Sequence, residues 1–303
     1  MLRKNWMLSL FAIILCALLS LAFTYAPQQK EKNKNAAADR GPVIIAQISD
    51  THVGLKRAPD AADNLRKVVQ MVNERNPDAV ILTGDIGERP EAWEEAREVL
   101  RGLKAKLFWI PGNHDVNQKN LDSWRGYWGK DYDQFHVKYV TIFALDSQLL
   151  GNYDDFHARD PEPLSDTNAS ESRKMLDWFA KEIENEKRQR DTKVIVAMQH
   201  VPISRANGGS FPEDPKPYWT TQEPYRSREL ELLHRLGIKH MFVGHWHKGM
   251  VYEADGITYH VAPATSWSDW DDHLGFAMHT ISPKGDVKTE FVNIPGADTH
   301  STH

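Results

Sequence analysis

The stretch Val43-Ile44-Ile45-Ala46-Gln47-Ile48-Ser49-Asp50-Thr51-His52 joins an apolar run to two metal-binding side chains. A short apolar run rich in β-branched residues is typical of a strand buried in a sheet. Asp50 and His52 follow it directly, and open α/β sheets bind their ligands just beyond the carboxyl ends of such strands. The stretch therefore predicts a buried strand that ends at a ligand-binding site.

The same arrangement recurs along the chain, each time as an apolar run followed by a polar motif. The runs span residues 79–82, 107–110, 193–198 and 241–243, and the motifs after them are Gly84-Asp85, Gly112-Asn113-His114-Asp115, His200 and Gly244-His245-Trp246-His247. The glycines leave room for turns and for close approach of the backbone. Because strand ends gather at one edge of a sheet, we expect these motifs to converge in space.

Helical patterns separate the strands. Apolar spacing predicts helices over 64–73, 91–103, 170–190 and 229–236, a further strand over 140–145, and antiparallel strands over 258–294 with a turn at Pro283-Lys284-Gly285. Alternating strands and helices predict a layered α/β fold. Periodicity by itself suggests a single open sheet.

The polar motifs supply seven side chains that can bind metal and one spare histidine. The seven are Asp50, His52, Asp85, Asn113, His200, His245 and His247, and the spare histidine is His114. Residues two apart on an extended strand end point the same way, so Asp50 and His52 would face one ion. A carboxylate such as that of Asp85 has two oxygens and can bridge two ions. Two-metal sites of this kind hydrolyse phosphate esters.

Simpler explanations exist for each residue taken alone. A single aspartate after a strand is commonly a helix cap rather than a ligand. The remaining histidines are assigned to the surface or the core: His136, His157, His234, His240, His260, His273 and His279. Suitable ligands after five separate strands nevertheless favour a metal site over coincidence.

These motifs, in this order, resemble those of the calcineurin-like metallophosphoesterase superfamily over residues 43–265. The resemblance implies two mixed β-sheets packed as a sandwich and flanked by helices, rather than one open sheet. It further implies two divalent ions that share Asp85. The first would be held by Asp50, His52, Asp85 and His247, and the second by Asp85, Asn113, His200 and His245. Mn, Fe and Zn all suit such ligands.

The implied activity is hydrolysis of phosphate esters by a metal-bridging hydroxide, with His114 as acid or transition-state stabiliser. The resemblance favours a phosphomonoesterase, for instance one acting on phosphoserine or phosphothreonine. An exported phosphodiesterase or nucleotide hydrolase is the alternative, and a non-catalytic scaffold is a remote one. The scaffold would require a lost ligand or a lost His114, yet every expected position is filled.

Three further features bear on the site. Glu88 lies three residues after Asp85. At this position the protein-phosphatase branch has an aspartate that pairs with the catalytic histidine. One hypothesis is therefore a Glu88–His114 pair, and the other is that Glu88 belongs to a solvated loop with Arg89. Residues 207–225 either shape the substrate pocket or form a plain surface loop. Trp267 and Trp270 either wall the pocket or pack in the core, and we favour core packing.

Composition argues against a nucleic-acid binder. The net charge is −5, and no basic run with interleaved aromatic residues occurs in the body of the chain. The only cysteine, Cys16, lies in the N-terminal apolar run, so the domain has neither a disulfide nor a cysteine ligand. Composition leaves the oligomeric state open.

The N-terminus has the features of a targeting segment. Arg3 and Lys4 precede an apolar run over residues 6–23, and residues 24–26 could be a cleavage site. We expect residues 1–26 to be a signal peptide or a membrane anchor, residues 27–41 a polar linker, residues 42–296 the domain and residues 297–303 a tail. Export to the periplasm or the extracellular space, or anchoring through residues 6–23, would follow.

Overall fold

The computed structural model describes residues 41–88, 90–188, 194–270 and 273–297. The expected targeting segment and nearly all of the expected linker lie outside these residues. A compact unit begins at Val43 and contains every named strand and helix. No helix in the described ranges is both long and apolar enough to cross a membrane.

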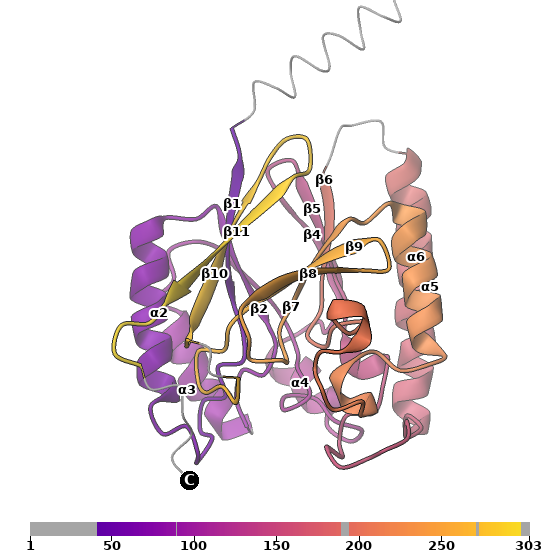
Figure 1. The fold of residues 1–303 in the computed structure, drawn as a ribbon, viewed down its shortest axis with the longest axis horizontal. Coiled ribbons are helices and arrows are strands. Elements are labelled where there is room, and N and C mark those ends of the chain that lie inside the picture. Colours follow the sequence, from indigo (N-terminus) through magenta and orange to yellow (C-terminus); the bar gives the residue numbers. More distant parts are fainter. Residues whose placement is uncertain (1–40, 89, 189–193, 271–272, 298–303) are drawn as a thin grey trace, which may run out of the picture. The chain divides into compact units, whose positions relative to one another are not determined.

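Two mixed sheets form the centre of this unit (Figure 1). The first sheet has the order β11 (Val287–Asn293), β10 (Gly275–Ile281), β1 (Val43–Ile48), β2 (Ala79–Thr83) and β3 (Leu107–Ile110). The second has the order β4 (Asp133–Val137), β5 (Val140–Ala144), β6 (Val194–Met198), β7 (His240–Val243), β9 (Ile257–Val261) and β8 (Met250–Ala254). The α/β fold with two mixed sheets is therefore confirmed.

The single open sheet suggested by periodicity is wrong, because both faces of the central strands are buried. Ile45 and Ile81 of the first sheet pack with Ile142, Val196 and Phe242 of the second in one apolar cluster. The alternate residues of the same strands pack in a second cluster with helical side chains. A strand covered on both faces is a continuous apolar run, and such a run does not reveal whether a helix or another sheet covers each face.

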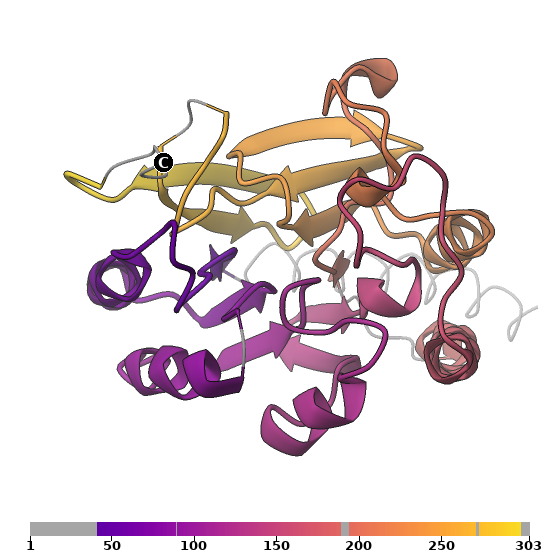
Figure 2. The same cartoon turned by 90° about the horizontal axis from the view of Figure 1, so that it is seen from below.

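Helices cover the outer faces of the sandwich. The helices α2 (Ala61–Arg75) and α3 (Pro90–Leu100) lie on one flank, and α5 (Asp166–Arg188) and α6 (Tyr225–Leu236) on the other (Figures 1 and 2). In α2, Leu65, Val68 and Val72 recur at helical spacing and are all buried. The helix ends at Arg75, and the C-cap residue Asn76 has the left-handed backbone typical of that position.

Sequence periodicity missed the elements that are short or partly exposed. These are α4 (Leu121–Tyr127), the edge strand β4 and the edge strand β8. The prediction of antiparallel strands over 258–294 holds only in part. Strand β9 pairs antiparallel with β8 but parallel with β7, whereas β10 and β11 are antiparallel. Residues 189–193, at the predicted end of α5 and start of β6, fall outside the described ranges.

The strand register brings the polar motifs to one edge of the sandwich. Strands β1, β2 and β3 are parallel, with Ile48 opposite Leu82 and Thr83 opposite Ile110, so their carboxyl ends are level. Strands β6 and β7 are likewise parallel in the second sheet. Figure 2 looks from below onto the loops that follow these strands.

Candidate metal centre

The loops after β1 and β2 are joined by backbone hydrogen bonds that continue beyond the strands. The backbone nitrogen of Asp50 donates to the Gly84 oxygen at 3.1 Å, and that of His52 donates to the Asp85 oxygen at 2.9 Å. On the other sheet, the nitrogen of Gly244 donates to the His200 oxygen at 2.9 Å. Each motif is therefore held in place by its neighbour.

This packing brings six of the seven predicted ligands into two adjoining groups. The first group is Asp50, His52, Asp85 and His247, the second is Asp85, His200 and His245, and within each the candidate ligand atoms lie within 4.8 Å of one another. Asp85 belongs to both, and every member is buried. The remaining predicted ligand, Asn113, places its Oδ1 3.1 Å from Nε2 of His200.

Each of the four histidines is oriented by a hydrogen bond on the side away from the cluster. Nδ1 of His52 donates to Oε1 of Glu88 at 2.6 Å, and Nδ1 of His200 donates to the Thr83 oxygen at 2.7 Å. The other two histidines donate to backbone oxygens: Nδ1 of His247 to Trp267 at 2.9 Å and Nε2 of His245 to Tyr218 at 2.9 Å. Such outer partners fix the tautomer of a metal-binding imidazole.

Where these imidazoles are neutral, their inward nitrogens therefore present lone pairs, which face one another and the carboxylate oxygens. Nε2 of His52 lies 3.1 Å from Nε2 of His247, and Nε2 of His200 lies 3.2 Å from Oδ2 of Asp85. Close lone pairs in a buried cluster repel unless a positive charge lies between them. The side chains therefore fit a pair of divalent cations, with imidazole and carboxylate ligands of the kind that Mn, Fe and Zn accept.

The pKa values of the cluster reflect burial opposed by neighbouring charges. Burial raises the pKa of Asp85, but the charges of His200 and His114 outweigh it and hold that pKa well below its usual range. Burial lowers the pKa of His200, but Asp85 and Asp50 raise it to about 9. Burial, together with the charge of His200, lowers the pKa of His245 to about 3. Metal binding would release the proton that His200 holds in the metal-free protein.

The backbone at the ligands differs from the extended geometry that the sequence suggested. Asp50 and His52 have φ of 51° and 38°, and His245 and His247 have φ of 69° and 50°. The reason is that β1 ends at Ile48 and β7 ends at Val243, so both pairs lie in turns beyond the strands. Left-handed backbone at residues other than glycine is sparsely populated and concentrates at functional sites.

Two glycines allow the motifs to approach closely. A Cβ added to Gly112 would lie 2.1 Å from Oδ1 of Asp85, and one added to Gly244 would lie 2.1 Å from Oγ of Ser49. No side chain fits at those distances. The glycines predicted to make room for close approach therefore do so against Asp85 and against the loop that carries Asp50.

Glu88 joins His114 to the cluster. Its Oε2 lies 3.1 Å from Nδ1 of His114, while its Oε1 accepts from His52. The hypothesised Glu88–His114 pair is thus present, and the same carboxylate also orients a predicted metal ligand. The two histidines lower the pKa of Glu88 to about 2 against the raising effect of burial. Burial lowers the pKa of His114, but Asp85 and Glu88 raise it to about 9.

Asp115 holds together the loop that carries Gly84-Asp85 and the loop that carries Gly112-Asn113-His114-Asp115. Its buried carboxylate accepts hydrogen bonds at 3.0–3.2 Å from the backbone nitrogens of Ile86, Gly87 and Gly112 and from Nε1 of Trp93. This role could not be read from the sequence, where Asp115 is one letter in a longer motif. The positions of Asp85, Glu88 and His114 all depend on the loops that Asp115 connects.

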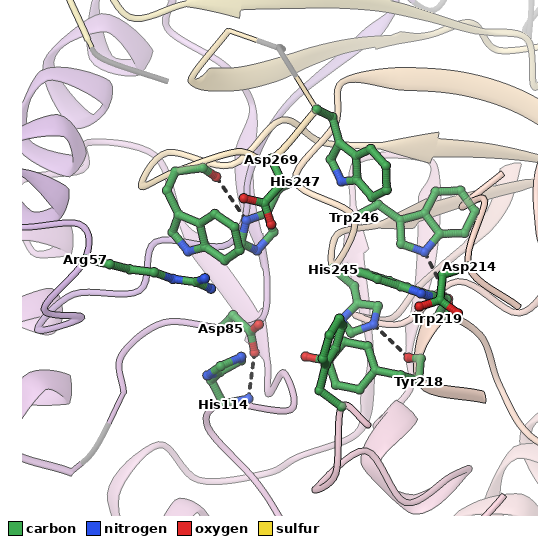
Figure 3. Close-up of a pocket in the computed structure, with 13 residues that line it drawn as sticks. Arg57, Asp85, His114, Asp214, Tyr218, Trp219, His245, Trp246, His247 and Asp269 are labelled. Atoms are coloured by element: carbon green, nitrogen blue, oxygen red, sulfur yellow. Dashed lines mark hydrogen bonds between the residues drawn. The ribbon is translucent and has the colours of Figure 1, made fainter. Parts of the chain in front are cut away.

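A cavity of about 460 Å³ opens onto the cluster (Figure 3). Asp85, His114, His245 and His247 line its floor, and the walls are Arg57, Phe156, Asp214, Tyr218, Trp219, Trp246, Trp267, Asp269 and Trp270. The segment 207–225 therefore contributes to the pocket. Trp267 and Trp270 also line it, so the favoured core-packing interpretation was wrong for Trp270 and incomplete for Trp267, which packs on Ala58 and Ala61 as well.

Tyr218 is a further pocket residue that sequence reasoning named only as part of a loop. Its hydroxyl accepts a hydrogen bond from Nδ2 of Asn113 at 2.8 Å, which leaves Oδ1 of Asn113 directed at the cluster. Its backbone oxygen orients His245. Only the path of the loop in space reveals these contacts, since Tyr218 lies more than a hundred residues from Asn113.

The family model for calcineurin-like phosphoesterases matches residues 44–249. Because this match covers more than half of the 303 residues, the chain belongs to the calcineurin-like phosphoesterase family. It is a hydrolase of phosphate esters with a buried His/Asp cluster suited to two divalent metal ions.

Relatives divide between phosphatases and phosphodiesterases. The chain is 27% identical over 237 residues to serine/threonine-protein phosphatase CPPED1 of Mus musculus, covering 69% of this chain and 70% of the relative. It is 24% identical over 250 residues to a probable cyclic nucleotide phosphodiesterase of Fibrobacter succinogenes, covering 79% and 86% respectively. The sequence resembles the branch typified by calcineurin-like phosphoesterase domain-containing protein 1 at residues 128–132, 145–148 and 199–202. The mouse protein represents this branch.

A solved structure supports the fold. A dimetal phosphatase from Danio rerio superposes with a TM-score of 0.59 at 12% identity, covering 83% of this chain and 96% of that one. At this identity the likeness shows the arrangement of sheets and helices and no more.

Proposed function

We propose that this protein is a two-metal phosphomonoesterase in which His114 donates a proton to the leaving oxygen or stabilises the charge of the transition state. The observation that carries the proposal is the position of His114. It lines the cavity beside Asp85 and belongs to neither of the two ligand groups that share Asp85. Its backbone nitrogen donates to Oδ1 of Asp85 at 2.9 Å, and its Nδ1 pairs with Glu88.

The proposed ligand sets are those that the family resemblance implied. One ion would be held by Asp50, His52, Asp85 and His247, and the other by Asp85, Asn113, His200 and His245. Such a pair of ions would supply Lewis-acid sites for phosphate oxygens and a water of lowered pKa as the nucleophile.

The residues around the ligands have separate tasks. Glu88 holds Nδ1 of His114 and so leaves Nε2 for the cavity, where a leaving-group oxygen would receive its proton. A third potential group, His52, Glu88 and His114, also lies within ligand distance. Glu88 already binds Nδ1 of both histidines, so we assign it to orienting them rather than to a third ion.

The relatives named serine/threonine-protein phosphatases favour a monoester substrate, for instance a phosphoserine or phosphothreonine side chain. A phosphodiesterase is the second candidate, because other relatives are named probable cyclic nucleotide phosphodiesterases. An exported location would suit scavenging of small organic phosphates or nucleotides, and it stays a proposal.

Initial rates with p-nitrophenyl phosphate and bis(p-nitrophenyl) phosphate, each with Mn, Zn and Fe in turn, test the proposal. We expect His114→Ala to keep its metal and to lose about 10²–10⁴-fold in turnover, the range typical of a lost general acid. Asp85→Asn should lose metal as well. The matched control is His136→Ala, at an exposed histidine of β4. Full activity of His114→Ala, or a wild type that cleaves diesters faster than monoesters, would contradict the proposal.

A further inference from the structure

Arg57 is a cation at the mouth of the metal centre. It follows β1 in the loop after His52 and lines the same cavity as Asp85 and His114. Of the described residues that line this cavity, Arg57 is the only arginine or lysine. Figure 3 shows its guanidinium pointing into the pocket on the side of Asp85 and His114, opposite Tyr218 and Trp219.

The guanidinium is positioned by stacking on the ring of Trp267, and no carboxylate of the described residues forms an ion pair with it. Its central carbon lies 3.3 Å from the centroid of the Trp267 ring. An arginine stacked on an aromatic face keeps its N–H donors in the plane of the fork, free for a ligand. Within the described ranges, no carboxylate forms an ion pair with Arg57, whereas Asp214 on the opposite wall pairs with Lys216 at 2.8 Å.

Trp267 contacts both Arg57 and the predicted metal ligands, and so fixes their relative positions. The backbone oxygen of Trp267 accepts from Nδ1 of His247, and its ring packs edge-on against the His247 imidazole with centroids 4.3 Å apart. The ring centroid of His52 lies 6.1 Å from that of Trp267. A phosphate bound over the cluster would therefore lie within reach of the Arg57 fork.

We propose that Arg57 binds a terminal oxygen of the substrate phosphate and thereby makes the site select monoesters over diesters. The inference rests on the proposed function, because it concerns the same site. The feature that supports it is a guanidinium that stacks on Trp267 beside the predicted ligands His52 and His247 and that forms no ion pair with a carboxylate of the described residues.

The number of terminal oxygens on phosphorus explains why Arg57 would favour monoesters over diesters. A phosphate monoester has three terminal oxygens, so one would remain for a guanidinium if the metal centre bound the other two. A diester has two terminal oxygens, and its guanidinium-facing oxygen is esterified and a poorer acceptor. The dianionic monoester also carries more charge for Arg57 to neutralise, and Arg matches phosphate through paired N–H donors.

The test compares Arg57→Gln and Arg57→Lys with Lys56→Gln, which removes the same charge from the neighbouring exposed residue. Two measurements are made on the Mn-loaded proteins: kcat/KM for p-nitrophenyl phosphate and its bis ester, and the Kd of inorganic phosphate by calorimetry. We expect Arg57→Gln to lower kcat/KM for the monoester about 10- to 100-fold, the range of a lost hydrogen bond between charged groups. The diester should change less than about threefold on the same reasoning.

Phosphate binding should weaken by a similar factor in Arg57→Gln, partly recover in Arg57→Lys and stay unchanged in Lys56→Gln, with equal metal content in all. Unchanged phosphate affinity in Arg57→Gln would overturn the inference whatever the turnover of the wild type. Equal losses for the two esters would overturn the selectivity. A wild type that binds phosphate through Arg57 yet cleaves neither ester would instead contradict the proposed function and leave the phosphate contact supported.

Discussion

Replacing Asp115 should break the connection between the two loops that carry Asp85 and His114. The carboxylate accepts from three backbone nitrogens and one indole, and it is fully buried. Asp115→Ala leaves all of these donors without a partner. Asp115→Asn keeps the oxygen that serves Ile86, Gly87 and Trp93 but turns an amide N–H₂ toward the nitrogen of Gly112.

The expected loss of stability follows from the number of orphaned donors. An unsatisfied buried donor costs about 1–3 kcal/mol, so Asp115→Ala should lose at least about 4 kcal/mol of unfolding free energy. Asp115→Asn leaves one of the four donors, the nitrogen of Gly112, without a partner, so it should lose about 1–3 kcal/mol on the same basis. The first loss is a large part of the ~5–15 kcal/mol that a typical domain has in total.

Urea denaturation in the presence of a chelator measures these losses without a contribution from metal. Asp122→Ala is the control, because it removes an exposed aspartate from the first turn of α4 and should cost less than about 1 kcal/mol. The reasoning is refuted if Asp115→Ala also costs less than about 1 kcal/mol, or if alanine and asparagine cost the same.

Further predictions concern the outer residues of the site and the core. Glu88→Gln, which weakens the hold on both His52 and His114, should lower kcat about 10- to 100-fold, and steady-state kinetics with unchanged rates would contradict it. Gly112→Ala places a Cβ against Asp85 and should reduce bound metal measured by mass spectrometry, whereas Gly126→Ala, which meets nothing within 4 Å, should keep it. Burial raises the pKa of Glu229 to about 8, so the folded chain holds a proton that the unfolded chain releases near pH 4.3, and stability falls as the pH rises between these values. Glu229→Gln should remove this pH dependence, so its unfolding free energy relative to the wild type should rise by about 4 kcal/mol between pH 5 and pH 8.5, measured by urea denaturation. A difference that does not change with pH would refute it.

The sequence predicted the strands that carry the site because each is a short, fully apolar run. The bounds of β1 and β3 match the prediction, and β2 extends one residue beyond it. The convergence of the polar motifs followed from one physical rule, that parallel strands bring their carboxyl ends to the same edge. Strand β4 and helix α4 were missed because residues 121–137 mix aromatic and charged residues without a clear period.

Other features depend on tertiary contacts that no local pattern contains. The left-handed backbone of Asp50 and His245 arises where the chain turns after its strand, and periodicity predicts the strand but not the turn. Arg57 and Trp267 lie about two hundred residues apart in the chain and meet only in the folded pocket. Glu88 was considered for His114 alone, while its second partner, His52, comes from a different strand end.

The direct test of the account is anomalous X-ray diffraction from crystals of the Mn-loaded protein, recorded at the manganese edge. The account predicts two peaks, one beside Asp50, His52 and His247 and the other beside Asn113, His200 and His245, with the carboxylate of Asp85 between them. A single peak, or peaks away from Asp85, would contradict a dinuclear centre built on that carboxylate.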